Sequence, residues 1–192
     1  YVSLERAKSV DKDKLIERAF DKFNKQNVDK NGDYIDALGQ LGFGHLELGT
    51  VTPEPQPGNP QPRMFRVKPA QAIINRMGFN NKGVDHLVKR LAARRYPGVV
   101  GANIGKQKDT PVDRAADDYL TCLEKVYPHC DYVAVNISSP NTENLRQLQD
   151  SGHLRELLEA IVRAGNDHAE TFGGKCPIVV KSLLCLLTPC MG

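Results

Sequence analysis

The segment Asn136–Thr142 (NISSPNT) gathers the side chains best suited to chemistry. An Asn side chain both donates and accepts hydrogen bonds, so it can bind a planar, amide-rich ring. Ser139, held by the following Pro140, can act as a base or nucleophile when a neighbouring group activates it. An ordinary Ser/Pro/Asn turn explains the same pattern, and the segment alone leaves both interpretations open.

Three further polar segments follow or interrupt apolar stretches. They are Asn75–Gly83 (NRMGFNNKG), Asn103–Lys106 (NIGK) and Lys181. A partly buried Lys needs an anionic or carbonyl partner, which makes Lys181 a candidate binding residue. The non-functional interpretations are a structured loop, a glycine turn and a Lys that extends to solvent along its own methylenes.

The segment Asp29–Asp33 (DKNGD) places oxygen-bearing side chains at the first, third and fifth positions of a calcium loop. The sixth position, which must turn as Gly, is Tyr34, and the twelfth, which should be Glu, is Gln40. These departures argue against a calcium-binding module. The five histidines show no metal-ligand spacing and no glycine-rich phosphate motif occurs, so we expect no metal site.

Apolar spacing predicts the elements that must position these residues. Thr110 is the expected N-cap of one helix, with Pro111 at its first helical position. The Asp113 carboxylate is expected to accept a hydrogen bond from the backbone of the cap residue. The predicted helices cover Asp11–Asn27, Asp33–Leu41, Val84–Ala92 and the stretches after Thr110 and Ser151. The predicted strands are short and apolar: Phe43–Gly49, Val99–Ile104, Tyr132–Ile137 and Pro177–Lys181.

Strands that alternate with helices predict a parallel sheet with crossover helices, an α/β fold. Periodicity does not separate a barrel from a doubly wound sheet. Polar residues cluster just after each strand, where a (β/α)8 TIM-type barrel builds its active site, so we favour the barrel. Segment 51–69 holds six of the twelve prolines and fits either a linker or a long ordered loop, of which we favour the loop.

Composition limits the classes of function. The chain has 192 residues, 40% of them hydrophobic, which supports one packed domain and argues against global disorder. Its 26 Lys and Arg and 23 Asp and Glu are spread out and aromatic residues are only 6%, so no nucleic-acid partner is expected. No apolar run could span a bilayer and no signal peptide is visible. The five irregularly spaced cysteines argue against a disulfide framework or zinc cage.

Longer motifs carry a resemblance to a known family. They are GTVTPEPQPGNPQPR (49–63), INRMGFNNKG (74–83), NIGKQKDT (103–110), DYVAVNISSPNTENLRQLQ (131–149) and PIVVK (177–181). In order and spacing they resemble dihydroorotate dehydrogenase of the quinone-dependent class, from about Asp29 to Lys181. The resemblance implies a (β/α)8 barrel with FMN at the C-terminal strand ends, oxidation of dihydroorotate to orotate, a quinone acceptor and a place in pyrimidine (UMP) biosynthesis. It also implies peripheral association with an inner membrane, mitochondrial or bacterial, through a segment not recognisable here.

The resemblance also assigns site residues, position by position. It implies Ser139 as the catalytic base, where the cytosolic classes carry a Cys. The FMN contacts it implies are Lys30, Thr50, Asn103, Asn136 and Lys181. The substrate contacts it implies are Lys30, Asn75, Arg76, Met77, Gly78, Phe79, Asn136 and Asn141.

The chain departs from the family pattern at both ends. FNKQNVDKNG (23–32) stands where the family has a small-residue strand, and SLLCLLTPCMG (182–192) stands where it continues with the units that hold the flavin phosphate. We therefore expect an atypical helical segment (1–27), a partial barrel (28–181) and a divergent tail (182–192). The alternative to a flavoenzyme chain is a non-catalytic remnant that interacts through exposed sheet edges. The sequence leaves open a fragment, a splice product or a gene-model error.

Overall fold

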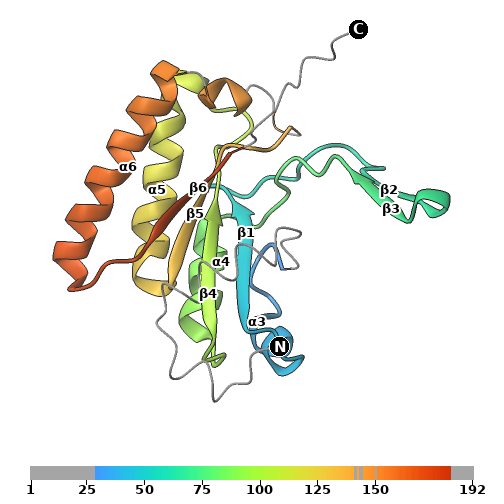
Figure 1. Cartoon of the computed structure of the whole chain (residues 1–192), viewed down its shortest axis with the longest axis horizontal. Coiled ribbons are helices and arrows are strands. Elements are labelled where there is room, and N and C mark those ends of the chain that lie inside the picture. Colours follow the sequence, from blue (N-terminus) through green and yellow to red (C-terminus); the bar gives the residue numbers. More distant parts are fainter. Residues whose placement is uncertain (1–28, 141, 143–144, 150, 183–192) are drawn as a thin grey trace, which may run out of the picture.

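Four parallel strands form the central sheet of the computed structural model, which describes residues 29–140, 142, 145–149 and 151–182 (Figure 1). Their spatial order is β1-β4-β5-β6. Helices connect β4 to β5 and β5 to β6, so the described residues form successive βα units. The bounds are β1 His45–Val51, β4 Val99–Ile104, β5 Tyr132–Asn136 and β6 Ile178–Lys181.

Three helices pack side by side on one face of this sheet (Figure 1): α4 (Val84–Ala93), α5 (Ala115–Val126) and α6 (Ser151–Phe172). Successive residues of a strand point to opposite faces, so every second strand residue meets these helices. Leu48, Ala102 and Val135 are fully buried in one apolar core with helix residues such as Leu87 and Leu123. Full burial of each Leu contributes about 1.5–3 kcal/mol to stability.

The opposite face of the sheet is mixed. Polar residues and a glycine alternate with the core positions at Glu47, Gly101, Asn103, Asn136 and Lys181, and Val99 and Val179 pack there against Tyr132 and Ala134. A Cβ at Gly101 would lie 2.1 Å from the Tyr132 ring, so the glycine makes room for that ring. The face away from the helices is therefore partly polar, which corrects the expectation of strands that are apolar throughout.

Most of the predicted elements are confirmed. The strand Val99–Ile104 has the predicted bounds, and β5 and β6 each differ from theirs by one residue. A short helix, α3 (Ile35–Gln40), lies inside the predicted stretch, α4 begins where predicted, and α6 begins at Ser151, one residue early. Strand β1 lies two residues later than the predicted Phe43–Gly49. The predicted helix Asp11–Asn27 lies outside the described residues.

The chain enters the sheet beside β1 at Asp29. This residue forms an isolated parallel bridge with Leu48, and the Gly49 amide donates to the Asp29 carbonyl at 3.3 Å. Asp29 therefore occupies the edge position at which a preceding parallel strand would pair with β1.

The predicted helix cap at Thr110 is wrong. Pro111 has an extended ψ of 154°, and Val112–Arg114 form a 3-10 turn, η2, that contains Asp113. Helix α5 begins only at Ala115, and no side chain caps it. The Thr110 carbonyl instead accepts a hydrogen bond from Lys106 Nζ. The chain is not yet helical at Pro111, so Thr110 has no helical amides to cap.

The Pro/Gly-rich segment leads into an antiparallel hairpin that sequence analysis missed. Strands β2 (Met64–Val67) and β3 (Ala72–Asn75) pair around a 3-10 turn, η1 (Lys68–Ala70), and project from the body (Figure 1). Met64, Phe65, Ile73 and Ile74 are all exposed. Because neither face of the hairpin is buried, its sequence carries no clear alternation of apolar and polar residues. No helix within the described residues is both long and apolar enough to cross a membrane.

Candidate active site

Three polar side chains from three adjacent strands meet at the carboxyl ends of the sheet. The Thr50 hydroxyl donates to Asn103 Oδ1 at 2.6 Å, and Asn136 Nδ2 donates to the Thr50 hydroxyl at 3.0 Å. All three residues are buried, with exposures of 2%, 0% and 6%. Each was predicted as a cofactor contact, and the fold brings them into one cluster.

The cluster retains hydrogen-bond donors that its internal bonds do not use. A carboxamide carries two N–H groups. Asn136 directs one at Thr50, and Asn103 directs one at Glu47 Oε1 at 2.7 Å. One N–H of each amide therefore remains to donate to an acceptor at the strand ends, where buried polar groups require partners.

Glu47 joins this cluster to Lys181, and sequence analysis missed it. Lys181 Nζ lies 3.5 Å from Glu47 Oε1, and the Tyr132 hydroxyl donates to Glu47 Oε2 at 3.3 Å. The anionic partner expected for Lys181 is therefore Glu47. Burial, followed by the negative charge of Glu47, raises the pKa of Tyr132 and keeps its hydroxyl protonated. The alternation of Glu47 with Leu46 and Leu48 is the sequence signal that could have identified it.

The backbone at Gly49 places Thr50 in the cluster. Gly49 has a φ of 121°, a region that favours glycine, and a Cβ there would lie 2.3 Å from the Asn103 carbonyl oxygen. The register of β1 against β4 shifts between Gly49 and Val51. This irregularity turns the Thr50 side chain toward Asn103 and Asn136.

The predicted substrate loop Asn75–Phe79 leaves the hairpin and returns to the sheet. Asn75 and Arg76 are exposed, Met77 is half-buried, and Gly78 and Phe79 are buried. The Arg76 guanidinium donates to the Pro62 carbonyl at 3.0 and 3.1 Å.

The buried Gln56 side chain fixes the returning part of the loop. Gln56 Nε2 donates to the carbonyls of Gly78 and Phe79 at 3.1 and 3.2 Å. The Phe79 ring reaches the end of the sheet and lies against Gly105. A Cβ at Gly105 would lie 2.9 Å from this ring and 2.6 Å from the Thr50 methyl, so only a glycine leaves room for both. Gln56 and Gly105 therefore hold the loop beside the cluster.

Two buried polar atoms have no hydrogen-bond partner within the described residues. They are Asn80 Oδ1 and Thr142 Oγ1. Asn80 follows the Asn75–Phe79 loop, and Thr142 belongs to the segment that contains Ser139. An unpartnered buried polar atom is costly, so both atoms indicate a place for a ligand group or water.

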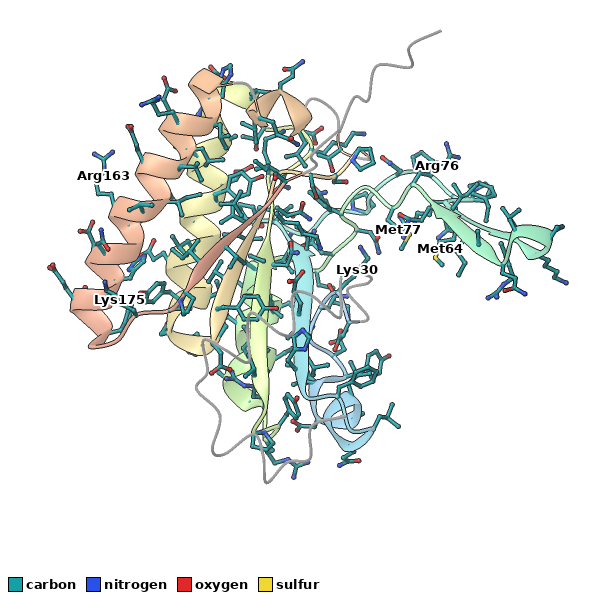
Figure 2. The ribbon with its side chains drawn as sticks, in the orientation of Figure 1. Lys30, Met64, Arg76, Met77, Arg163 and Lys175 are labelled. Carbon is teal, nitrogen blue, oxygen red and sulfur yellow. The ribbon has the colours of Figure 1, made fainter. Side chains whose placement is uncertain are left out.

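Lys30 lies on the side of the sheet from which the hairpin projects, as Met77 does (Figure 2). Burial, reinforced by the positive charge of Arg63, lowers the pKa of the Lys30 ammonium group. Burial and the repulsion from Arg63 both disfavour the charged form of Lys30. An anionic ligand would stabilise that charged form, so the position favours binding of an anion.

Ser139 lies three residues after Asn136, in the segment that leaves β5. The Ser138 amide and hydroxyl both donate to Asn136 Oδ1, at 3.0 and 2.9 Å, which fixes the chain as it leaves the strand. Ser139 is half-buried and Pro140 is exposed. The predicted substrate contact Asn141 lies outside the described residues.

The Asp29–Asp33 segment is organised as a backbone turn. The Asp29 carboxylate accepts hydrogen bonds from the amides of Asn31, Asp33 and Tyr34, at 3.2, 3.1 and 2.6 Å. These bonds use the oxygen atoms of Asp29 that a calcium loop would turn to the ion, and the Asn31 and Asp33 oxygens bond to Lys82 and His86 instead. No group of three or more His, Cys, Asp or Glu side chains within the described ranges gathers to hold a metal.

Lys106 was part of a candidate segment, and its role is structural. The residue is 1% exposed, and its ammonium group donates to the carbonyls of Gln107 at 2.8 Å, Lys108 at 3.4 Å and Thr110. These bonds fix the loop between β4 and α5, and the glycine-turn interpretation of this segment omitted them.

Parallel βα units that bring amide, hydroxyl and lysine groups to the carboxyl ends of the strands define part of a TIM-type α/β barrel with a polar site. The chain belongs to the dihydroorotate dehydrogenase family, since the family model "Dihydroorotate dehydrogenase" matches residues 23–185. Its relatives include dihydroorotate dehydrogenase (quinone) of Ectopseudomonas mendocina, 61% identical over 154 residues, and that of Azotobacter vinelandii, 62% identical. The matches cover 80% of this chain and 45% and 44% of these relatives.

A solved structure shows the same fold. The crystal structure of DHODH from Eimeria tenella in complex with ferulenol matches with a TM-score of 0.71 and 39% sequence identity. The match covers 80% of this chain and 46% of that one. The chain therefore spans less than half the length of these relatives.

Proposed function

We propose that this chain carries the dihydroorotate site and the flavin-ring contacts of an enzyme that oxidises dihydroorotate to orotate with FMN and a quinone acceptor. The observation that carries the proposal is the buried Thr50–Asn103–Asn136 cluster at the carboxyl ends of three adjacent strands. Family membership and the quinone-class relatives support the reaction. Pyrimidine biosynthesis and peripheral membrane association follow as parts of the same proposal.

The cluster fits the ring of FMN. The flavin ring presents carbonyl oxygens and ring nitrogens that accept hydrogen bonds, and the unused N–H groups of Asn103 and Asn136 are donors. Lys30 and Lys181 add positive charge that stabilises a reduced, anionic ring. When bound, FMN supplies the acceptor for the hydride.

The substrate lies, in this proposal, between Ser139 and the loop Asn75–Phe79. Asn75 and Asn141 hold the dihydroorotate ring, whose amide N–H and carbonyl groups match carboxamides, and the one free N–H of Asn136 lies between this ring and the flavin as a donor to either. Asn80 Oδ1 and Thr142 Oγ1, both buried and unpartnered, are additional acceptors for a ring N–H. Lys30 pairs with the substrate carboxylate, which offsets the cost of its burial beside Arg63.

Ser139 takes the proton from one ring carbon while hydride leaves the neighbouring carbon. A serine hydroxyl is a very weak base in water, so it needs a dry pocket and a hydrogen-bonded path for the proton. The half-buried position of Ser139 after the fixed Asn136–Ser138 turn supports this role.

The proposal is tested by transplanting this site into a full-length relative. The aligned 154 residues of this chain replace the corresponding segment of the Azotobacter vinelandii relative, with which they share 62% identity. We expect the purified chimera to bind FMN and to reduce a quinone analogue in the presence of dihydroorotate. A folded, FMN-loaded chimera without dihydroorotate-dependent turnover contradicts the proposal.

The second candidate is a chain that only interacts with others. The observation that favours it is the edge of the described sheet at β6, where Val180 is 42% exposed. An open strand edge can pair with another chain. Size-exclusion chromatography separates the two candidates, since a concentration-dependent oligomer without flavin affinity supports the interaction role. The proposed division into segments 1–27, 28–181 and 182–192 assigns both functions to the middle segment.

A further inference from the structure

Two cysteines lie side by side at the end of the sheet opposite the candidate active site. Cys130 directly precedes Asp131 and β5, and Cys176 comes two residues before β6. The strands are parallel neighbours, and the Val133 amide donates to the Pro177 carbonyl at 2.9 Å, so both strands begin at the same end. The two sulfur atoms are 4.0 Å apart.

The backbone around both cysteines is firmly held. The Cys130 thiol lies 3.3 Å from the Val126 carbonyl, and the Cys176 amide donates to the Tyr127 hydroxyl at 3.1 Å. The Tyr127 hydroxyl in turn donates to the Gly165 carbonyl of α6 at 3.1 Å. These bonds join the start of β6 to the end of α5 and to α6 and keep the two sulfurs together.

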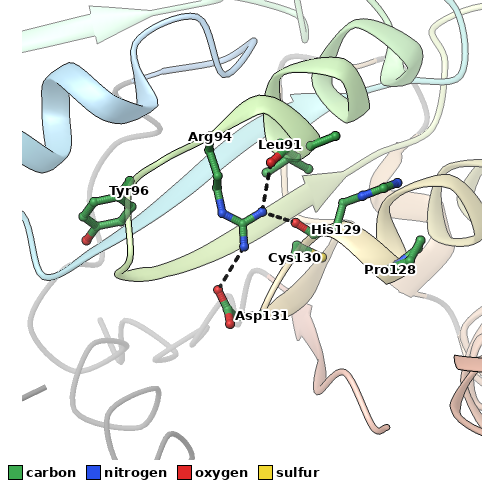
Figure 3. A pocket seen from close by; sticks show the side chains of 8 residues that line it. Leu91, Arg94, Tyr96, Pro128, His129, Cys130 and Asp131 are labelled. Carbon is green, nitrogen blue, oxygen red and sulfur yellow. Dashed lines mark hydrogen bonds and ion pairs between the residues drawn. The ribbon is translucent and has the colours of Figure 1, made fainter. Parts of the chain in front are cut away.

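The residues on either side of Cys130 are anchored by Arg94. Figure 3 shows the Arg94 guanidinium reaching the His129 carbonyl and the Asp131 carboxylate, the latter at 3.6 Å. Arg94, His129, Cys130 and Asp131 line a surface pocket with a volume of about 540 Å³. A disulfide needs a sulfur–sulfur distance near 2 Å. The two sulfurs must therefore approach each other by about 2 Å to form the bond.

The two thiols differ in the way that thiol exchange requires. The hydrogen bond between the two thiols lowers the pKa of Cys176, and the same bond together with burial raises the pKa of Cys130. Both residues are half-buried, and the Cys176 thiol is the less deeply buried of the two, so a reagent reaches it more readily. The thiolate is the nucleophile in exchange, which makes Cys176 the attacking group and Cys130 the resolving group.

We propose that Cys130 and Cys176 form an oxidisable pair that closes into an intrachain disulfide by exchange with a low-molecular-weight disulfide such as oxidised glutathione. Cys176 attacks the reagent, forms a mixed disulfide and releases one glutathione thiol. Cys130 then attacks the Cys176 sulfur, its proton passes to solvent, and the second glutathione leaves as a thiolate. Two protein thiols are oxidised and one glutathione disulfide is reduced, so the electrons balance.

The disulfide would tie the start of β5 to the start of β6 across the whole of α6. The two cysteines are 46 residues apart, so the closed loop is long. Cross-linking a long loop restricts the unfolded chain, and we expect the melting temperature to rise by roughly 5 °C. The candidate active site lies at the other end of β6, so its cluster keeps its contacts.

The test is peptide mapping of the full chain after incubation with oxidised glutathione. Remaining thiols are alkylated and the chain is digested with trypsin without reductant. Cleavage after Lys125, Arg146, Lys175 and Lys181 places Cys122, Cys130 and Cys176 on separate peptides and Cys185 and Cys190 together on a fourth. We expect residues 126–146 linked to 176–181, and the link should disappear with dithiothreitol. Cys122 is fully buried, with its pKa raised by burial, and serves as the internal control that stays reduced.

Two variants separate the roles of the sulfurs. In Cys130→Ser the mixed disulfide should accumulate on Cys176, and in Cys176→Ser both Cys130 and glutathione should stay unlinked. If Cys130→Ser does not fold, Cys130→Ala supplies the same measurement in an apolar setting. A chain in which Cys176 remains alkylatable, or in which Cys176 links to the peptide 182–192 instead, overturns the proposal.

Discussion

At the scale of single residues, Ser139 is the side chain on which the proposed chemistry depends. Removing a general base typically lowers the reaction rate by about 10²–10⁴. It does not by itself remove a contact to the cofactor. We expect Ser139→Ala in the chimera to lower turnover by about that factor while FMN stays bound. Steady-state rates with a quinone analogue measure the first effect and the flavin absorbance measures the second. Thr121→Ala, which removes an exposed hydroxyl on α5, is the control, and a Ser139→Ala rate within about threefold of the parent would remove Ser139 from the role.

Lys181 makes a different residue-scale prediction, about the cofactor. Its side chain is 42% exposed, and its ammonium group pairs with Glu47 at 3.5 Å, at the end of the strand next to Asn136. We expect Lys181→Ala in the chimera to lose FMN during gel filtration, since a positive charge near the ring is removed. Lys175→Ala, which removes an exposed Lys at the other end of β6, should retain it. Equal FMN occupancy in both variants would contradict the assignment.

At the scale of elements, the junction of β1 with β4 depends on Gly49. An Ala at this position combines an unfavourable φ of 121° with a Cβ 2.3 Å from the Asn103 carbonyl. We expect Gly49→Ala to lower the free energy of unfolding by more than about 1 kcal/mol, because the backbone must shift. Gly44→Ala is the control, since nothing lies within 4 Å of its Cβ. Urea unfolding of both variants measures the difference, and equal midpoints would show that the junction tolerates a side chain.

Helix α4 is tied to the start of the described chain by Asp33, which gives a pH-dependent prediction. The hydrogen bonds from Lys82 and then His86 lower the pKa of Asp33 below its usual 3.8, although burial opposes them. The unfolded chain therefore takes up this proton at a higher pH than the folded chain. The stabilisation is present above about pH 4 and is lost as the pH falls through the lowered pKa.

Asp33→Asn should therefore lower the melting temperature at pH 7 and lower it by less at pH 3. Asp113→Asn, an exposed carboxylate in η2, should leave both values near those of the parent. Thermal melting across this pH range checks the prediction. An Asp33→Asn deficit that is as large at pH 3 as at pH 7 would mean that the ion pairs do not stabilise the fold.

The same scale shows what the sequence could predict. The strand Val99–Ile104 was predictable as a short apolar run and helix α6 from apolar residues on one helical face, because burial against a continuous core selects those positions. The hairpin β2–β3 was missed since neither of its faces is buried. The cap at Thr110 failed because the local Thr-Pro pattern was outweighed by the loop that Lys106 organises. The alternation of Glu47 with Leu46 and Leu48 marks it as facing away from the core, but its role depends on partners that lie far away in the sequence.

At the scale of the whole molecule, the chain contains the proposed contacts to the flavin ring but spans 44–45% of its relatives. The family resemblance assigns the flavin phosphate to later barrel strands. A phosphate anchored by charge-assisted hydrogen bonds gains about 1.5–3 kcal/mol from each. Several such bonds together account for many powers of ten in affinity.

We therefore expect a polypeptide limited to these 192 residues to bind FMN weakly and not to oxidise dihydroorotate. The Thr50–Asn103–Asn136 cluster would still offer its donors, but hydrogen bonds to the ring alone, exposed to water, give little net affinity. Thermal melting with increasing FMN measures binding, with the chimera as the positive control. A saturable stabilisation at micromolar FMN, with dihydroorotate-dependent reduction of a quinone analogue, would contradict this expectation. That result would mean that residues 182–192 or a second copy of the chain complete the phosphate site.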